Sequence, residues 1–135
     1  MKIRVNGIPA PQGSKRHVGG GRMVEQSRAV GPWREAVRTE TQHAVACEPN
    51  GVGIPPGRPV CVRIMFLLIR PKTAPKSRRF PDKRPDLDKL CRAVLDGLTA
   101  GGAFADDGQV VTLFAWKHFA RGTETPGCEI NVEEL

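Results

Sequence analysis

The stretch that most limits the possible folds is VCVRIMFLLI, residues 60–69. It is β-branched and apolar over the length of a strand, and both of its alternating faces are apolar. This pattern is typical of a central strand covered on both sides. The longest apolar run within it is the six residues 64–69. A membrane span needs about 20 such residues, so no membrane protein is predicted.

The other elements follow from the same periodicity arguments. A helix is predicted from Gly31-Pro32 to about Cys47, because Pro suits a first helical turn, and Trp33 is expected to anchor it in the core. Leucines at helical spacing predict a second helix over 87–99. Further strands are expected at 2–9, 109–119 and 127–133, with loops at 10–22, 48–59 and 70–83. The sequence therefore predicts one α+β domain over residues 1–135, with a mixed sheet of about four or five strands and two main helices.

Charge indicates the kind of partner. The chain has 21 Lys and Arg against 14 Asp and Glu, a formal net charge of +7. Small basic proteins usually bind polyanions, most often nucleic acid. Aromatic residues make up only 5%, which disfavours a single-strand binder built on stacked aromatic rings. The residues expected to contact DNA are Lys15, Arg16, Lys76, Arg78, Arg79, Lys83, Arg84 and Lys89.

Cysteine usage and the N-terminus indicate the compartment. The four cysteines contain no C-x-x-C pair, so no structural zinc site is expected, and reduced, mostly buried thiols are predicted. No apolar stretch follows Met1-Lys2, so no secretory signal is predicted. We therefore expect a cytoplasmic protein.

Two short acidic segments stand out in this basic chain: RPDLDKL at 84–90 and DDGQV at 106–110. Each aspartate also has a purely structural interpretation. Asp86 can cap the second helix, Asp88 can favour its dipole, and Asp107-Gly108 is an ordinary turn. If the helix packs on the sheet, however, the two segments could meet at one edge. Clustered carboxylates repel unless a cation lies between them, and their oxygens suit Mg²⁺.

The same segments carry a family resemblance. The pattern R-P-D-L-D-K-L-C-R-A-V-L-D-G-L (84–98), then D-D-G-Q-V-V (106–111), then Lys117 resembles the RusA family of Holliday-junction resolvases. The close match covers about 34 residues, 84–117, and a weaker one includes G-I-P-A-P-Q-G-S-K (7–15). The combined motif is specific, whereas D-x-D alone would be weak.

The resemblance implies roles for individual residues. Asp86, Asp88 and Asp107 match the family's metal-binding carboxylates, and Asp106 matches the adjacent acid. Lys117 matches the basic residue on the neighbouring strand, with an exposed strand lysine as the structural alternative. Arg92 or Lys117 is expected to act in catalysis by offsetting the charge that develops on the phosphate.

Three positions depart from the family pattern. Arg92 stands where the family usually has Lys, which keeps the charge but changes donor geometry. Lys89 replaces Asn, and Gly97 replaces Ala at a cost of about 1 kcal/mol in helix propensity. Asp88, Arg92 and Asp96 share one helix face at i, i+4 and i+8. Arg92 is therefore expected to approach Asp88, with Asp96 as its structural partner.

The function implied by the resemblance is hydrolysis of a DNA phosphodiester with Mg²⁺, which Mn²⁺ could replace. The implied substrate is a four-way junction, and the implied products carry 5′-phosphate and 3′-hydroxyl ends. A homodimer is implied, because resolution needs two symmetric nicks. Two alternatives remain open: the same chemistry on flaps or forks, and a basic DNA-binding protein without catalysis. Many members of this family come from phages and prophages, which would be a plausible origin.

Overall fold

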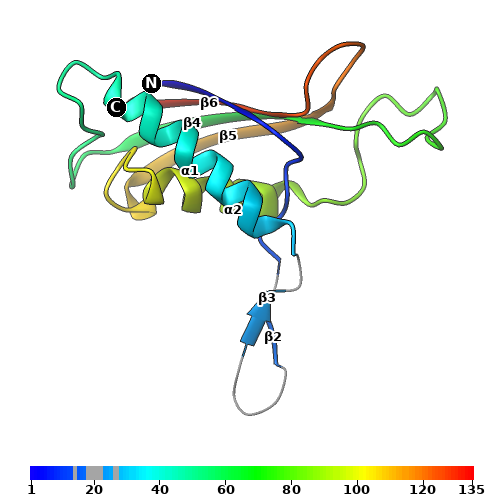
Figure 1. The fold of residues 1–135 in the computed structure, drawn as a ribbon, viewed down its shortest axis with the longest axis horizontal. Coiled ribbons are helices and arrows are strands. Elements are labelled where there is room, and N and C mark those ends of the chain that lie inside the picture. The colour runs from blue at the N-terminus through cyan, green and yellow to red at the C-terminus, as the bar shows by residue number, and fades with distance from the viewer. Residues whose placement is uncertain (14, 18–22, 26–27) are drawn as a thin grey trace.

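The computed structural model describes residues 1–13, 15–17, 23–25 and 28–135; side chains between positions 14 and 27 lie outside this description. A four-stranded mixed sheet forms the centre of the molecule (Figure 1). Its strands lie in the order β1 (Lys2–Asn6), β6 (Gly127–Glu134), β4 (Val60–Leu68) and β5 (Val110–Phe119). β4 pairs antiparallel with β6 and parallel with β5, so it is the central strand that its apolar sequence predicts.

Two helices pack side by side on one face of this sheet (Figure 1). They are α1 (Val30–Ala46) and α2 (Leu87–Ala100), and α2 belongs to the connection between the parallel strands β4 and β5. Trp33 is buried under α1, as predicted, and Leu90, Val94 and Leu98 bury the apolar face of α2. The α+β fold, with its mixed sheet and two main helices, is confirmed.

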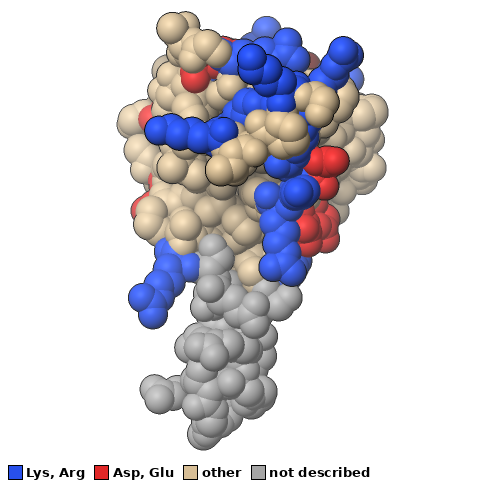
Figure 2. Space-filling view, turned by 90° about the vertical axis from the view of Figure 1, so that its right-hand side faces the viewer, with Lys and Arg blue, Asp and Glu red and all other residues tan. Residues whose placement is uncertain are grey.

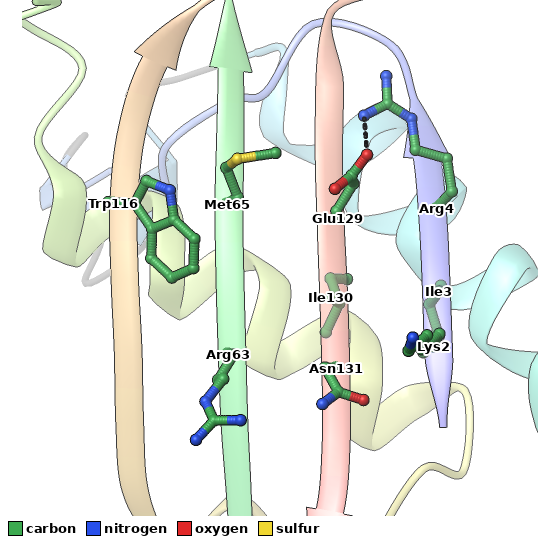
Figure 3. Close-up of a pocket in the computed structure, with 9 residues that line it drawn as sticks. All are labelled: Lys2, Ile3, Arg4, Arg63, Met65, Trp116, Glu129, Ile130 and Asn131. Atoms are coloured by element: carbon green, nitrogen blue, oxygen red, sulfur yellow. Dashed lines mark ion pairs between the residues drawn. The ribbon is translucent and has the colours of Figure 1, made fainter.

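The opposite face of the sheet carries no helix in the part of the chain that the structure describes (Figure 3). The prediction that β4 is covered on both sides therefore holds only at its ends, where Cys61 and Leu67 of this face are buried, and is wrong at its middle. Arg63 on this face is exposed and Met65 is half-buried. The physical reason is that α1 packs against α2, so both helices cover the same face of the sheet.

The predicted loop at 10–22 is also partly wrong. β2 (Lys15–His17) and β3 (Met23–Glu25) pair antiparallel as a separate ribbon. Three-residue strands carry too little apolar periodicity to be recognised in the sequence. The other boundaries agree with the prediction within a few residues, and a short 3₁₀ turn, η1 (Asp107–Gln109), precedes β5.

The four cysteines are free thiols, of which Cys61, Cys91 and Cys128 are buried and Cys47 is exposed. This confirms the expectation of mostly buried thiols. Burial raises the pKa of the Cys128 thiol to about 12. None of the helices in the described residues is long and apolar enough to cross a membrane.

Gly97 lets the two helices approach closely. A Cβ atom added at Gly97 would lie 2.7 Å from Val37 Cγ1 and 3.2 Å from the Arg34 carbonyl oxygen. Val37 is fully buried and β-branched, so its side chain cannot easily turn aside. Glycine at this position therefore relieves a steric clash as well as lowering helix propensity.

Replacing Gly97 by alanine is expected to lower the free energy of unfolding by up to about 2 kcal/mol, because overpacking usually costs about 1–3 kcal/mol. The gain in helix propensity, about 1 kcal/mol, offsets only part of this. Chemical denaturation of Gly97→Ala measures the change. The double variant Gly97→Ala with Val37→Ala removes the clashing methyl groups. If the second substitution does not make the effect of the first less unfavourable, the helix contact is not the cause.

Candidate nuclease site

Asp88 and Asp107 line one shallow pocket, although they come from segments far apart in the sequence. Asp88 lies in the first turn of α2, and Asp107 begins η1 just before β5. Leu113 and Ala115 of β5 also line the pocket, which has a volume of about 580 Å³. α2 packs against both η1 and β5; its first turn lies beside the end of β5, where Lys117 contacts Pro85, whereas η1 lies at the beginning of β5. The two acidic segments therefore border the same pocket through Asp88 and Asp107, but they do so from near opposite ends of β5.

Arg92 lines the same pocket, one helical turn after Asp88. Its side chain is exposed and forms no ion pair within the described residues. The expected pairing of Arg92 with Asp96 is wrong. Asp96 instead pairs with Arg34 of α1, at 3.9 Å between Arg34 Nη1 and Asp96 Oδ2, so this ion pair joins the two helices. The Arg92 guanidinium is therefore available to pair with an anion that enters the pocket.

Asp86 stands at the N-cap position of α2, as predicted, but its side chain makes no capping hydrogen bond. It lies 3.6 Å from the Lys89 ammonium, measured from Oδ2 to Nζ, and does not line the pocket of Asp88 and Asp107. Within the described residues, no three acidic, His or Cys side chains are close enough to hold a metal together. Among the described residues, the carboxylates that line this pocket are those of Asp88 and Asp107. Asp86 lies two residues before Asp88 and pairs with Lys89.

The Asp106 side chain caps the short 3₁₀ turn η1. Its Oδ2 accepts a hydrogen bond from the Gly108 backbone N–H at 3.0 Å, and Gln109 Oε1 accepts from the Asp106 backbone N–H at 2.9 Å. This reciprocal arrangement is a capping box. Gln109 Nε2 also donates to the carbonyl oxygens of Pro55 (2.9 Å) and Arg58 (3.0 Å). Gln109 thereby fixes the turn that carries Asp107. The sequence analysis gave Gln109 no role, although the spacing D-x-x-Q is a recognisable signal for such a box.

Lys117 is neither a free strand lysine nor a lining residue of the pocket. Its ammonium donates to the carbonyl oxygens of Lys83 and Pro85, each at 2.9 Å. β5 turns this side chain toward the helix-covered face, opposite Phe66 of β4. Lys117 therefore fastens the segment that leads directly into Asp86 and α2.

Cys91 is the one thiol beside the carboxylates. It lines the pocket with Asp88 and is buried. Burial, and secondly the negative charge of Asp88, raise the pKa of Cys91 to about 11. The thiol therefore stays protonated at neutral pH, which makes it a poor metal ligand and a weak nucleophile.

The comparison with known protein families agrees with this geometry. The family described as endodeoxyribonuclease RusA matches residues 5–133, nearly the whole chain. The chain belongs to the RusA endodeoxyribonuclease family. No curated protein gives a significant match. The match extends well beyond the acidic motifs, and includes both helices, β4, β5, nearly all of β6 and the end of β1.

The structure accounts for two departures from the RusA pattern. Lys89, in place of Asn, supplies the ion pair to Asp86. Gly97, in place of Ala, avoids contact with Val37. Arg92, in place of Lys, keeps a positive charge at the pocket, and its planar guanidinium can donate two parallel hydrogen bonds to one phosphate.

The basic loop, residues 70–84, gives this RusA family member a positively charged end. Figure 2 shows Lys and Arg side chains gathered over the end of the molecule that carries this loop, beside a smaller acidic group. Lys76, Arg79, Lys83 and Arg84 are exposed, as expected for residues that contact DNA.

Arg78 differs from the other arginines of the basic loop. Its Nε donates to Asp82 Oδ1 at 2.9 Å, and its guanidinium lies over the Phe119 ring at 5.5 Å from the centroid. The hydrogen bond to Arg78 lowers the pKa of Asp82 below its ordinary value. Arg70 donates to the carbonyl oxygens of Arg78 (2.6 Å) and Pro75 (2.5 Å). These contacts shape the loop, so Arg78 contributes to its form as well as to its charge.

The remaining predicted DNA contacts, Lys15 and Arg16, have their backbone in β2, but their side chains lie outside the described residues. The nearby Gln12 is only 6% exposed. Its backbone N–H donates to the Lys89 carbonyl oxygen at 3.0 Å, and its Oε1 accepts from Arg34 Nη1 at 2.9 Å. The proline-rich segment that precedes β2 is thus attached to α2.

Proposed function

We propose that this protein hydrolyses DNA phosphodiester bonds at four-way junctions, in a reaction that depends on Mg²⁺ or Mn²⁺. The products would carry 5′-phosphate and 3′-hydroxyl ends. The observation that carries the proposal is the shared pocket of Asp88 and Asp107, with Arg92 beside them, in a chain of the RusA endodeoxyribonuclease family. A protein that only binds DNA would not require two carboxylates in this pocket.

The donor set of the pocket fits a hard divalent cation. Mg²⁺ is usually held by one or two carboxylates together with water and substrate phosphate. Asp88 and Asp107 each offer one carboxylate to the pocket, from near opposite ends of β5, and Asp86 would join Asp88 only by leaving Lys89. When bound, the cation would make water more acidic and withdraw charge from the phosphoryl oxygens.

The protein residues would orient and neutralise the substrate. Arg92, exposed at the pocket, would pair with a phosphate oxygen and offset the charge that develops as the phosphodiester is cleaved. Gln109 and Lys117 would keep the two acidic segments in place through their backbone contacts. The leaving 3′ oxygen would depart opposite the attacking water.

A homodimer is part of this proposal. A four-way junction needs two nicks in strands of like polarity, and two copies related by a two-fold axis provide two equivalent sites. Sedimentation analysis of the free protein measures the mass directly. A protein that remains monomeric both alone and on the junction would contradict paired cleavage by a dimer.

The deciding experiment is incubation with a labelled synthetic four-way junction, with and without Mg²⁺. We expect two symmetric nicks that require the metal, and little cleavage of a linear duplex of the same sequence. Flap and fork substrates belong to the same panel. Faster cleavage of a flap or a fork than of the junction would reassign the substrate without changing the chemistry.

The basic loop leads to a separate prediction about binding. Replacing Lys76 and Arg79 by glutamine should reduce the steepness with which junction affinity falls with salt. Each lost phosphate contact lowers the slope of log K against log salt by about 0.9. Filter binding of the metal-free protein at several salt concentrations measures it. Arg38→Gln removes one exposed charge on α1 and serves as control. Equal slopes for the loop variant and the wild type would exclude these contacts.

A further inference from the structure

The uncovered face of the sheet carries a row of exposed rings. The chain has five Phe and two Trp residues. Four of these are buried, and the three exposed ones are Phe80 (60%), Phe114 (50%) and Trp116 (40%). Phe114 and Trp116 alternate along β5, opposite Arg63 and Met65 of β4. His118 continues the row, and Phe80 lies against it with ring centroids 6.3 Å apart. We name Phe80, Phe114, Trp116 and His118 the aromatic row.

A shallow hollow of about 480 Å³ extends from Trp116 across the sheet to β1 (Figure 3). Figure 3 shows the Trp116 ring beside Met65, with Arg63 further along the same strand. The hollow is rich in cations: Lys2, Arg4 and Arg63 line it against a single carboxylate, Glu129. Arg4 pairs with Glu129 at 3.7 Å. The surface therefore combines flat apolar rings with an excess of positive charge.

We propose that this face binds an unpaired DNA strand, with bases stacked on Trp116 and Phe114 and phosphates near Lys2 and Arg63. Single-strand sites combine a cationic groove with aromatic side chains in this way, because every base has a face that can stack. Residues two apart on a strand lie about 6.6 Å from each other, so each ring can hold its own base. The Arg63 guanidinium lies over the Phe114 ring, 5.2 Å from the centroid, so a base that stacks on this face of Phe114 would displace Arg63 toward a neighbouring phosphate.

The inference rests on the proposed action on branched DNA and adds a second contact surface to it. Leu113 and Ala115 line the catalytic pocket from one face of β5, whereas Phe114 and Trp116 belong to the other face. A paired arm in the pocket and an unpaired strand on the aromatic row would therefore contact the same strand of the sheet. Such a surface would favour substrates that contain, or open into, single-stranded DNA. Charge favours DNA over a second copy, because two copies would bring the cations of the hollow together.

The test uses labelled oligothymidylate of 20 nucleotides and the full chain without divalent metal. Trp33 is only 3% exposed, so changes in tryptophan emission on titration report mainly on Trp116. We expect quenching of this emission, and a loss of affinity of about tenfold to hundredfold for Trp116→Ala in fluorescence anisotropy. Trp116→Phe, which keeps a ring, should retain most of the affinity. Val111→Ala removes an exposed β5 side chain that belongs neither to the aromatic row nor to the hollow, and should bind as the wild type.

Three results would overturn the inference: no quenching by the oligonucleotide, equal affinity of the alanine variant and the wild type, or emission that changes with protein concentration alone. The last would mean that a second copy covers the row. Junction cleavage is measured separately on the same proteins. If no DNA is cleaved but the titration succeeds, only the proposed nuclease function fails. If cleavage proceeds and the titration fails, only the aromatic row is excluded.

Discussion

Asp88→Asn is expected to abolish cleavage of a four-way junction while the protein still binds it. The substitution keeps the size of the side chain and removes the charge that would hold the divalent ion in the pocket with Asp107. Loss of a group that stabilises transition-state charge commonly reduces turnover by about 100- to 1000-fold, and loss of the metal site itself should reduce it further. Binding should persist, because the cations of the basic loop are unchanged and a negative charge near the phosphates is gone.

Single-turnover cleavage and metal-free junction binding, measured on the same preparation, test this expectation. Glu35→Gln removes an exposed carboxylate from α1, outside the pocket, and should cleave normally. Circular dichroism confirms that both variants fold. If Asp88→Asn cleaves the junction at the wild-type rate, the assignment of the catalytic pocket is wrong.

Lys117→Met is expected to reduce junction cleavage by about tenfold to hundredfold. Hydrogen bonds from a charged donor contribute about 1.5–3 kcal/mol each, and Lys117 makes two of them to the segment that precedes Asp86. Without these hydrogen bonds, the start of α2 would be held less firmly. Small displacements of catalytic groups strongly reduce the reaction rate. The variant should therefore also need more Mg²⁺ for half-maximal activity.

The salt dependence of junction binding separates this positioning role from a direct phosphate contact. A lysine that binds phosphate lowers the slope of log K against log salt by about 0.9 when it is removed. A lysine that supports the protein backbone leaves the slope unchanged. Lys117→Arg keeps the charge but cannot place one small ammonium between two carbonyl oxygens, so it should rescue cleavage only in part. A lower salt slope with an unchanged Mg²⁺ requirement would contradict the positioning role.

The main elements could be predicted because their patterns are local. Residues 60–69 are apolar on both faces, and the leucines of α2 repeat at helical spacing, so the type and approximate bounds of these elements follow from the sequence. The two acidic motifs could also be recognised as a family signature, because their combined spacing is specific. The packing of α2 against η1 and β5 then brings Asp88 and Asp107 into one pocket.

Side-chain partners were less predictable, because they depend on contacts between distant segments. Helical spacing alone paired Asp96 with Arg92, but α1 supplies Arg34 to Asp96 instead. The same applies to Asp86, which pairs with Lys89 rather than capping its helix. Aromatic content does not say where the rings lie, for a similar reason. Four rings are buried in the interior and the remaining three are exposed beside β5, a distribution that composition does not contain.

The sequence by itself determined the strands, the helices, the basic loop and the acidic motifs of a RusA family member, since each depends on the order of neighbouring residues. Only the tertiary structure decided that both helices share one face of the sheet, that Lys117 holds the chain before Asp86, and that the opposite face remains open. These features arise from packing and hydrogen bonds between segments tens of residues apart. No local pattern encodes which of several possible partners such a segment will find.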